Sequence, residues 1–169
     1  VGRMTKEKGL SYLLEALEQM DDAWPDNFYL LLVGEGNYLA EMQDACKTLQ
    51  HNKNIIFCGK QFDIEKYLHA SDFFIQSSLH ENLSISILEA CAAKLPCLAT
   101  NVGGNAEMIT DQETGILVPP YSAEALKENL IRLCDREIRE KLKACMTARI
   151  FKSECRQAIG CRISAVAAE

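Results

Sequence analysis

Apolar residues along the chain follow two patterns that alternate from one end to the other. Leu10, Leu13, Leu14 and Leu17 repeat at the spacing of one helix face. The run 28–33 is instead continuously apolar, which predicts a short strand buried on both faces. The same two patterns predict further strands at 55–58, 72–76, 96–100 and 115–118, and further helices at 38–49, 64–70, 84–94, 106–109, 123–134 and 136–148.

This order of elements predicts the fold class. Strands separated by helices favour βαβ units, and therefore an α/β, Rossmann-like parallel sheet with helices on both faces. In such sheets ligands bind at the carboxyl ends of the strands. Glycine-rich or charged motifs follow the predicted strands that end near Val1 and at Val33, Cys58, Gln76 and Thr100. We therefore expect one site at this edge of the sheet.

Length and charge limit the remaining choices. The chain has 169 residues, about one domain, and a formal net charge of -6. This charge argues against general affinity for nucleic acid or an anionic membrane, and no apolar run approaches the length of a membrane span. Val1-Gly2-Arg3 resembles neither a signal peptide nor an ordinary N-terminus, and we expect it to lie part-way through a strand. Residues 1–150 are predicted to form the domain, with 151–169 as a tail of uncertain packing.

Eight cysteines raise the alternative of a disulfide scaffold. Cys58, Cys91 and Cys97 fall within apolar strand or helix patterns, and no Cys-x-x-Cys or Cys/His metal spacing occurs. We therefore expect reduced thiols, no metal site and a cytoplasmic protein. Peripheral contact with the inner membrane stays open for a longer protein.

Glu81 and Glu89 are the most informative pair of side chains. The first falls on the loop after a predicted strand and the second on the following helix. Two carboxylates at one crevice suit a polyhydroxylated ligand, because an ionised carboxylate accepts from neighbouring hydroxyls. A glycosidase acid and nucleophile is the less favoured use, since both residues come from one strand–loop–helix corner. We expect His80, a lone histidine, to be a loop or packing residue.

The N-terminal motif could hold a diphosphate. Gly2 permits a turn and close approach of a ligand, while Arg3 offers a fork of donors and Lys8 a compact charge before a helix. The alternative is a solvated basic loop at a chain terminus.

Two further loops follow predicted strands. Gly34-Glu35-Gly36 half-matches a dinucleotide fingerprint, but Leu39 stands where the third glycine should be, so a structural turn is favoured. The loop 59–63 could seat a flat base through backbone groups and an apolar wall. Alone, it is better explained as a helix-start loop with Asp63 as N-cap.

Gly103 and Gly104 follow another predicted strand, and two glycines there permit close backbone approach to a ligand. Glu107 either faces the crevice or lies at a helix start, where its charge complements the helix dipole, and the sequence favours neither alternative.

Together these motifs resemble the C-terminal, donor-binding domain of GT-B glycosyltransferases, specifically glycosyltransferase family 4. The resemblance covers residues 1–150, and the order and spacing of its motifs make it specific. The matching segments are Val1-Gly2-Arg3 with Lys8-Gly9, Leu32 to Gly36, Ile56 to Gly59, Glu81 to Ala90, Pro96 to Thr100, Gly103-Gly104 with Glu107, and Thr114 to Val118.

The resemblance implies a role for each matching residue. Arg3 and Lys8 would hold the donor diphosphate and stabilise its charge as it leaves. Glu89 would bind the ribose hydroxyls, and Glu81 the hydroxyls of the transferred sugar. The remaining donor contacts would come from Gly2, the loop Lys60–Asp63 with Gln61 and Phe62, the residues Asn82, Leu83 and Ser84 at a helix N-terminus, and Gly103 and Gly104.

The implied activity is that of a retaining glycosyltransferase using a UDP-, GDP- or ADP-linked sugar, without a cofactor or metal. Its acceptor, a glycan, lipid or small molecule, would bind an N-terminal domain absent from this chain, so the fragment is expected to be inactive alone. Asn82 stands where the family commonly has glycine, and Leu83-Ser84 stands where it commonly has an aromatic residue followed by glycine or proline. These departures affect the expected contacts to the sugar more than those to the nucleotide. The alternatives are a non-catalytic flavodoxin-like scaffold domain and another GT-B-type enzyme such as a sugar-nucleotide epimerase.

Overall fold

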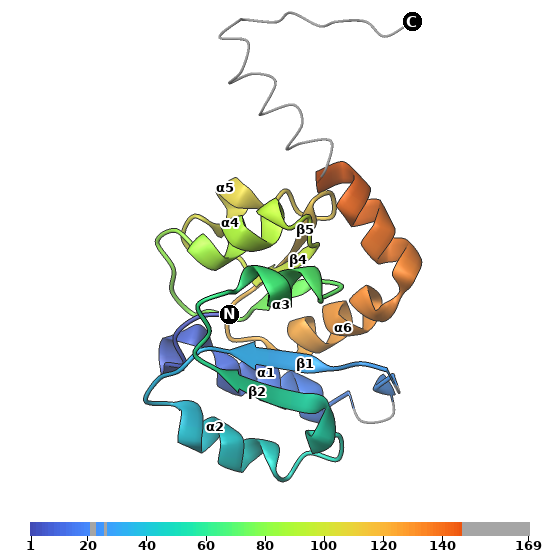
Figure 1. The fold of residues 1–169 in the computed structure, drawn as a ribbon. Coiled ribbons are helices and arrows are strands. Elements are labelled where there is room, and N and C mark those ends of the chain that lie inside the picture. The colour runs from blue at the N-terminus through green and yellow to red at the C-terminus, as the bar shows by residue number, and fades with distance from the viewer. Residues whose placement is uncertain (21–22, 26, 147–169) are drawn as a thin grey trace, which may run out of the picture.

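The computed structural model describes residues 1–20, 23–25 and 27–146, and strands and helices alternate along them (Figure 1). The strands are β1 Leu30–Val33, β2 Ile55–Gly59, β3 Phe74–Gln76, β4 Cys97–Thr100 and β5 Gly115–Val118. The α-helices are α1 Leu10–Glu18, α2 Leu39–Cys46, α3 Glu65–His69, α4 Ile85–Ala92, α5 Asn105–Met108 and α6 Ala123–Cys134, with helix again at 136–146. Short 3-10 turns occupy Lys6–Lys8 and Asn52–Asn54. In the described ranges, no helix is both long and apolar enough to cross a membrane.

The strands pair in parallel, as the pattern predicts, but in two sheets rather than one. β1 pairs with β2, and β4 lies between β3 and β5. Figure 1 shows the N-terminus between the two sheets. Within the described residues, the expected single sheet is thus interrupted between β1 and β3.

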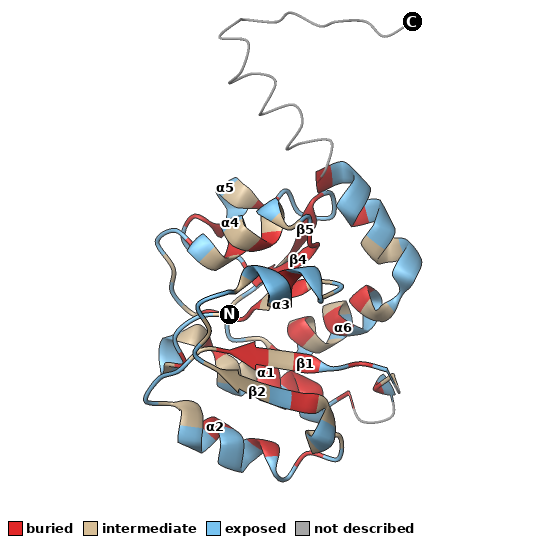
Figure 2. Ribbon diagram, in the orientation of Figure 1, coloured by how far each residue is buried: buried red, intermediate tan, exposed pale blue. Residues whose placement is uncertain are grey.

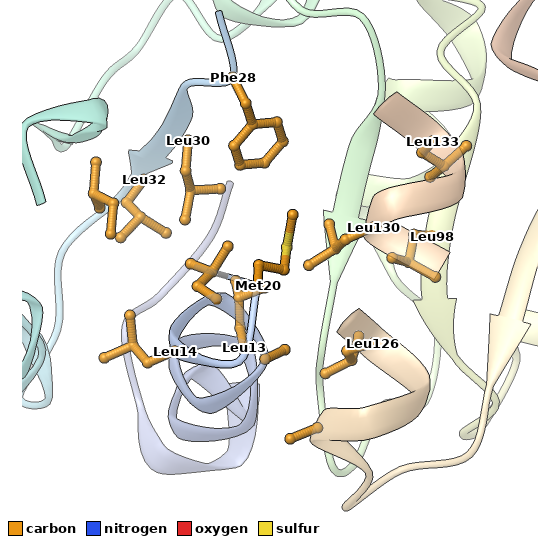
Figure 3. Packing of buried hydrophobic residues seen from close by; sticks show 14 of the residues in the cluster. Leu13, Leu14, Met20, Phe28, Leu30, Leu32, Leu98, Leu126, Leu130 and Leu133 are labelled. Carbon is orange, nitrogen blue, oxygen red and sulfur yellow. The ribbon is translucent and has the colours of Figure 1, made fainter. Parts of the chain in front are cut away.

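One apolar core joins the two sheets on one face. It includes Leu30 and Leu32 of β1 and Leu98 of β4, with α1 and α6 packed over them. Figure 3 shows Leu13 of α1 facing the β1 side chains while Leu126 of α6 lies beside the second sheet. These buried residues hold the sheets in place, although no backbone ladder among the described residues connects the two sheets.

A second core lies on the opposite face of the three-stranded sheet. Cys97 and Ala99 of β4 pack there against Ile87 and Ala90 of α4. Because neighbouring strand residues point to opposite faces, Leu98 joins the first core while its neighbours join the second. This explains the continuous apolar run, and β4 is buried along its whole length (Figure 2).

Several element ends differ from the sequence expectation. The strand expected at 72–76 begins at Phe74, and the N-cap of α3 is Ile64 rather than Asp63. Ser84 caps α4, since its hydroxyl accepts a hydrogen bond from the backbone N–H of Ile87. The tail 151–169 lies outside the described residues, and the domain boundary at residue 150 stays a prediction.

Candidate functional site

Glu81 meets Lys8 at the carboxyl edge of the sheet. The Lys8 ammonium donates to Oε1 of Glu81, and the same oxygen accepts from Nε2 of Gln76 at 3.1 Å and from the Ser78 hydroxyl at 2.9 Å. Only 11% of the Glu81 side chain is exposed, against 31% for Lys8. These donors hold the carboxylate in one orientation, because charge-assisted hydrogen bonds are stronger than neutral ones.

A buried polar network supports this contact from behind. Nε2 of Gln76 also donates to the Ser84 hydroxyl at 2.6 Å, and Nδ2 of Asn105 donates to Oε1 of Gln76 at 3.2 Å and to the Thr100 carbonyl at 2.9 Å. The network joins β3, β4 and the starts of α4 and α5. Its members are nearly inaccessible to solvent. Glu81 and the α4 N-terminus are therefore positioned by the same amide side chain.

Sequence reasoning did not identify Gln76, Ser78 or Asn105 as site residues. One signal was available for Gln76, a polar residue at the carboxyl end of an otherwise apolar strand. Ser78 lies on the loop after β3, three residues before Glu81, and Asn105 is the first residue of α5. The contact of Asn105 with Gln76 joins segments that are distant in sequence.

Gly103 and Gly104 lie directly against the Glu81–Asn82 backbone. A Cβ at Gly103 would come within 1.6 Å of the Glu81 carbonyl oxygen, and its φ is +51°. The Gly104 N–H donates to the Asn82 carbonyl at 3.0 Å. The glycine pair thus fixes the loop that carries Asn82 and Leu83, both of which are exposed.

The N-terminal segment runs beside the end of β1. The Gly2 N–H donates to the Val33 carbonyl at 2.9 Å, and the Met4 N–H donates to the Glu35 carbonyl at 2.7 Å. Gly34 is required there, because its φ is +140° and a Cβ would lie 1.8 Å from the Gly2 carbonyl oxygen. The Gly34–Gly36 turn therefore packs against the N-terminal segment, as expected of a structural turn.

Arg3 is exposed on this segment. Next to it, the Ser86 hydroxyl of α4 donates to the Val1 carbonyl at 3.1 Å. Glu89 is half-buried on α4, three residues after Ser86 and therefore on the same side of the helix. The structure thus brings Gly2, Lys8, Glu81, Ser84, Glu89 and the Gly103–Gly104 pair to one edge.

The loop after β2 has its own contacts. Nε2 of Gln61 donates to the Cys58 carbonyl at 2.7 Å, which closes the turn. Phe62 is 92% exposed, with the Lys60 ammonium 5.6 Å from its ring centre. An exposed aromatic ring of this kind offers a surface for a flat ligand.

The remaining sequence expectations concern His80, Glu107 and a metal site. His80 is exposed, and Glu107 is exposed in the first turn of α5. Within the described ranges, no cluster of three or more His, Cys, Asp or Glu residues is arranged to hold a metal ion.

Comparison with known proteins identifies the family and the fold. Residues 1–149 match the family model described as "Glycosyl transferases group 1". The crystal structure of the C-terminal domain of a glycosyl transferase group 1 family protein from Francisella tularensis superposes with a TM-score of 0.81 at 28% identity, covering 91% of this chain and 83% of that one. The predicted resemblance to the C-terminal, Rossmann-like domain of GT-B glycosyltransferases is thereby confirmed.

Two curated relatives act on different acceptors, as their names state. A UDP-Gal:alpha-D-GlcNAc-diphosphoundecaprenol alpha-1,3-galactosyltransferase from Escherichia coli is 28% identical over 141 residues, which cover 82% of this chain and 36% of that protein. A 2-deoxystreptamine glucosyltransferase from Streptomyces kanamyceticus is 30% identical over 137 residues, covering 80% and 35%. The chain spans about a third of the length of these relatives.

Proposed function

Because the chain belongs to the glycosyl transferases group 1 family, we propose that it is the donor-binding part of a retaining glycosyltransferase. The complete enzyme would transfer a sugar from a nucleotide-diphosphate sugar to an acceptor hydroxyl. The observation that carries this proposal is the contact of Lys8 with Glu81, which unites a cation and a carboxylate from distant segments at the ligand-binding edge. A scaffold domain has no need of this arrangement, and Glu81 does not point away into solvent.

The two cations suit the leaving diphosphate. Breaking the sugar–phosphate bond sends its electron pair to the phosphate oxygen, so negative charge grows on the diphosphate. Arg3 and Lys8 would bind that charge, and the N–H groups of Leu83 and Ser84 at the start of α4 would add to it. Donors aimed at charge that develops during the reaction lower the barrier more than they aid substrate binding. Basic side chains in this role would replace a metal ion.

The carboxylates suit the hydroxyls of the donor. Glu81, held through Oε1, would present its other oxygen to the transferred sugar. Glu89 would accept from the ribose hydroxyls, while Gln61 and Phe62 would face the base. Gly2, Asn82 and the Gly103–Gly104 pair would let the donor approach the backbone.

The reaction needs an acceptor and, in the retaining outcome, a front-face approach to the anomeric carbon. The acceptor oxygen would bond to that carbon on the side that the diphosphate leaves, and the acceptor's hydroxyl proton would pass to the departing phosphate oxygen. We place the acceptor site on a further domain of the longer protein, as the length of the relatives suggests. That domain would decide which class of acceptor is used. The two relatives named above are both similar to this chain and yet differ in their acceptors.

Calorimetric titration of the chain with UDP, GDP and ADP tests the donor half of the proposal. One of the three should bind, and Arg3→Ala and Glu89→Ala should each weaken it roughly 10- to 100-fold, the effect of losing a hydrogen bond to a charged group. Arg132→Ala and Glu128→Ala on α6 are matched controls and should leave the affinity unchanged. The proposal is wrong if no nucleotide binds at millimolar concentration or if the site variants behave like the controls.

The same protein sample tests whether the donor and the acceptor bind to different domains. We expect no sugar transfer by the 169-residue chain, because the acceptor site would be elsewhere. Robust transfer to any acceptor by this chain alone would contradict that expectation.

A further inference from the structure

Two cysteines meet where helix α4 ends and strand β4 begins. Cys91 lies in the last turn of α4, and Cys97 is the first residue of β4. A hydrogen bond joins their thiol groups. Cys97 belongs to the core between α4 and the three-stranded sheet, and Cys91 packs against that core. Both cysteines are free, so the structure holds two neighbouring thiols rather than a disulfide.

The turn between these cysteines is closed by backbone hydrogen bonds. The Leu95 N–H donates to the Ala90 carbonyl at 2.9 Å. The Lys94 N–H donates to the carbonyl of Cys91 itself, also at 2.9 Å. These two bonds form a Schellman motif, in which one residue takes a left-handed backbone, here Lys94 with a φ of +60°. On the strand side, the Cys97 thiol donates to the Leu95 carbonyl at 3.4 Å. An ordered turn therefore holds the two sulfur atoms against each other.

Access to solvent differs between the two thiols. Cys91 is half-buried, whereas Cys97 is fully buried. The hydrogen bond to Cys91 and, next, burial raise the pKa of the Cys97 thiol well above its usual range, so Cys97 stays protonated at neutral pH. Since the thiolate is the form of cysteine that reacts with dissolved oxidants, Cys97 is inert toward them. Oxidation would therefore begin at Cys91, and Cys97 would react only with the neighbour that it already contacts.

We propose that Cys91 and Cys97 form a reversible dithiol pair that closes into an internal disulfide when the protein meets a hydroperoxide. Hydrogen peroxide would oxidise the Cys91 thiol to a sulfenic acid and would itself be reduced to water. The Cys97 sulfur would then attack the Cys91 sulfur. The S–S bond forms, the S–O bond breaks, and the hydroxyl leaves as a second water with the Cys97 proton. Contact between the two sulfur atoms makes this step intramolecular, which offsets the weak nucleophilicity of a protonated thiol. A dithiol reductant would reopen the bridge by thiol–disulfide exchange.

This dithiol pair is separate from the candidate donor site. Cys91 comes two residues after Glu89, which is about 200° around a helix, so the two side chains lie on nearly opposite sides of α4. Ser84 lies at the other end of the same helix. The bridge would join α4 to β4 without removing any group of the candidate donor site. The inference therefore does not rest on the proposed function.

Digestion with trypsin separates the two cysteines and can therefore report the bridge. Cleavage after the exposed Lys94 leaves Cys91 in peptide 67–94 and Cys97 in peptide 95–127, and neither peptide contains another cysteine. The folded chain is treated with hydrogen peroxide, the remaining thiols are alkylated in urea, and the digest is analysed by mass spectrometry without reductant. Cys145→Ser, at an exposed free thiol, is the matched control. In a second variant, Cys97→Ala, dimedone traps any sulfenic acid that forms at Cys91.

Peptides 67–94 and 95–127 joined by a disulfide should exceed every other pairing of either cysteine by at least about 10-fold, because the two thiols are already in contact. Dithiothreitol should separate the peptides, and Cys145→Ser should leave their yield unchanged. Cys97→Ala should raise dimedone labelling of Cys91 at least about 10-fold over the wild type, because the thiol that consumes the sulfenic acid is gone.

The proposal is wrong if Cys91 becomes a sulfinic acid, or pairs with another cysteine, while Cys97 is still alkylated as a thiol. Equal dimedone labelling of Cys91 in the wild type and in Cys97→Ala would also overturn it. So would an equal yield of the joined peptides from a chain that is unfolded in urea before peroxide is added, because the fold would then not determine the pairing. If Cys97→Ala does not fold, the wild-type digests of the folded and unfolded chain decide the question.

Discussion

Replacing Gln76 by alanine tests whether the buried amide positions the candidate site. The substitution removes a hydrogen bond to the Glu81 carboxylate and two to the neutral partners Ser84 and Asn105. A bond to a charged group contributes about 2 kcal/mol and a neutral one about 1 kcal/mol, and partial compensation by Lys8 reduces the sum to about 3 kcal/mol. At roughly 2–4 °C per kcal/mol for a chain of this size, the melting temperature should fall by about 6–12 °C.

Urea unfolding followed by circular dichroism measures the loss, and an unchanged slope would show that only stability changed. Gln19→Ala is the matched control, because Gln19 is exposed and makes one long hydrogen bond to Glu15, at 3.4 Å. It should change stability by less than about 0.5 kcal/mol. The reasoning about Gln76 fails if the two variants lose the same stability, since the buried network would then contribute nothing that water does not replace.

Two further substitutions probe the same edge. Gly103→Ala should lower the free energy of unfolding in urea by at least about 2 kcal/mol, because its left-handed φ and the nearby Glu81 carbonyl leave no room for a Cβ. A variant as stable as the wild type would show that the Glu81 backbone does not lie so close to Gly103. Ser122→Ala removes a helix N-cap and should cost about 1 kcal/mol, whereas Ser84→Ala removes an N-cap and the hydrogen bond from Gln76 and should cost about 2 kcal/mol. Only Ser84→Ala should weaken nucleotide binding in calorimetry. Equal nucleotide affinities of the two variants would show that the α4 N-terminus is not part of the site.

Most secondary structure was predictable because the buried strands are short and apolar throughout. β4 illustrates this, since Leu98 faces one core and Cys97 and Ala99 the other, so no polar residue interrupts the run. The ends were less predictable. Asp72 and Phe73 continue the apolar pattern of β3 only in part, and the strand begins at Phe74, where the backbone first pairs with Pro96.

The division into two sheets was not predictable from periodicity. An apolar run indicates that a strand is buried but does not indicate which strand lies beside it. The runs that form β1 and β3 are therefore equally compatible with one sheet or with two. The site shows the same limit. Sequence order placed Lys8 and Glu81 at one edge, but the network through Gln76 and Asn105 follows from tertiary contacts that short-range patterns do not encode.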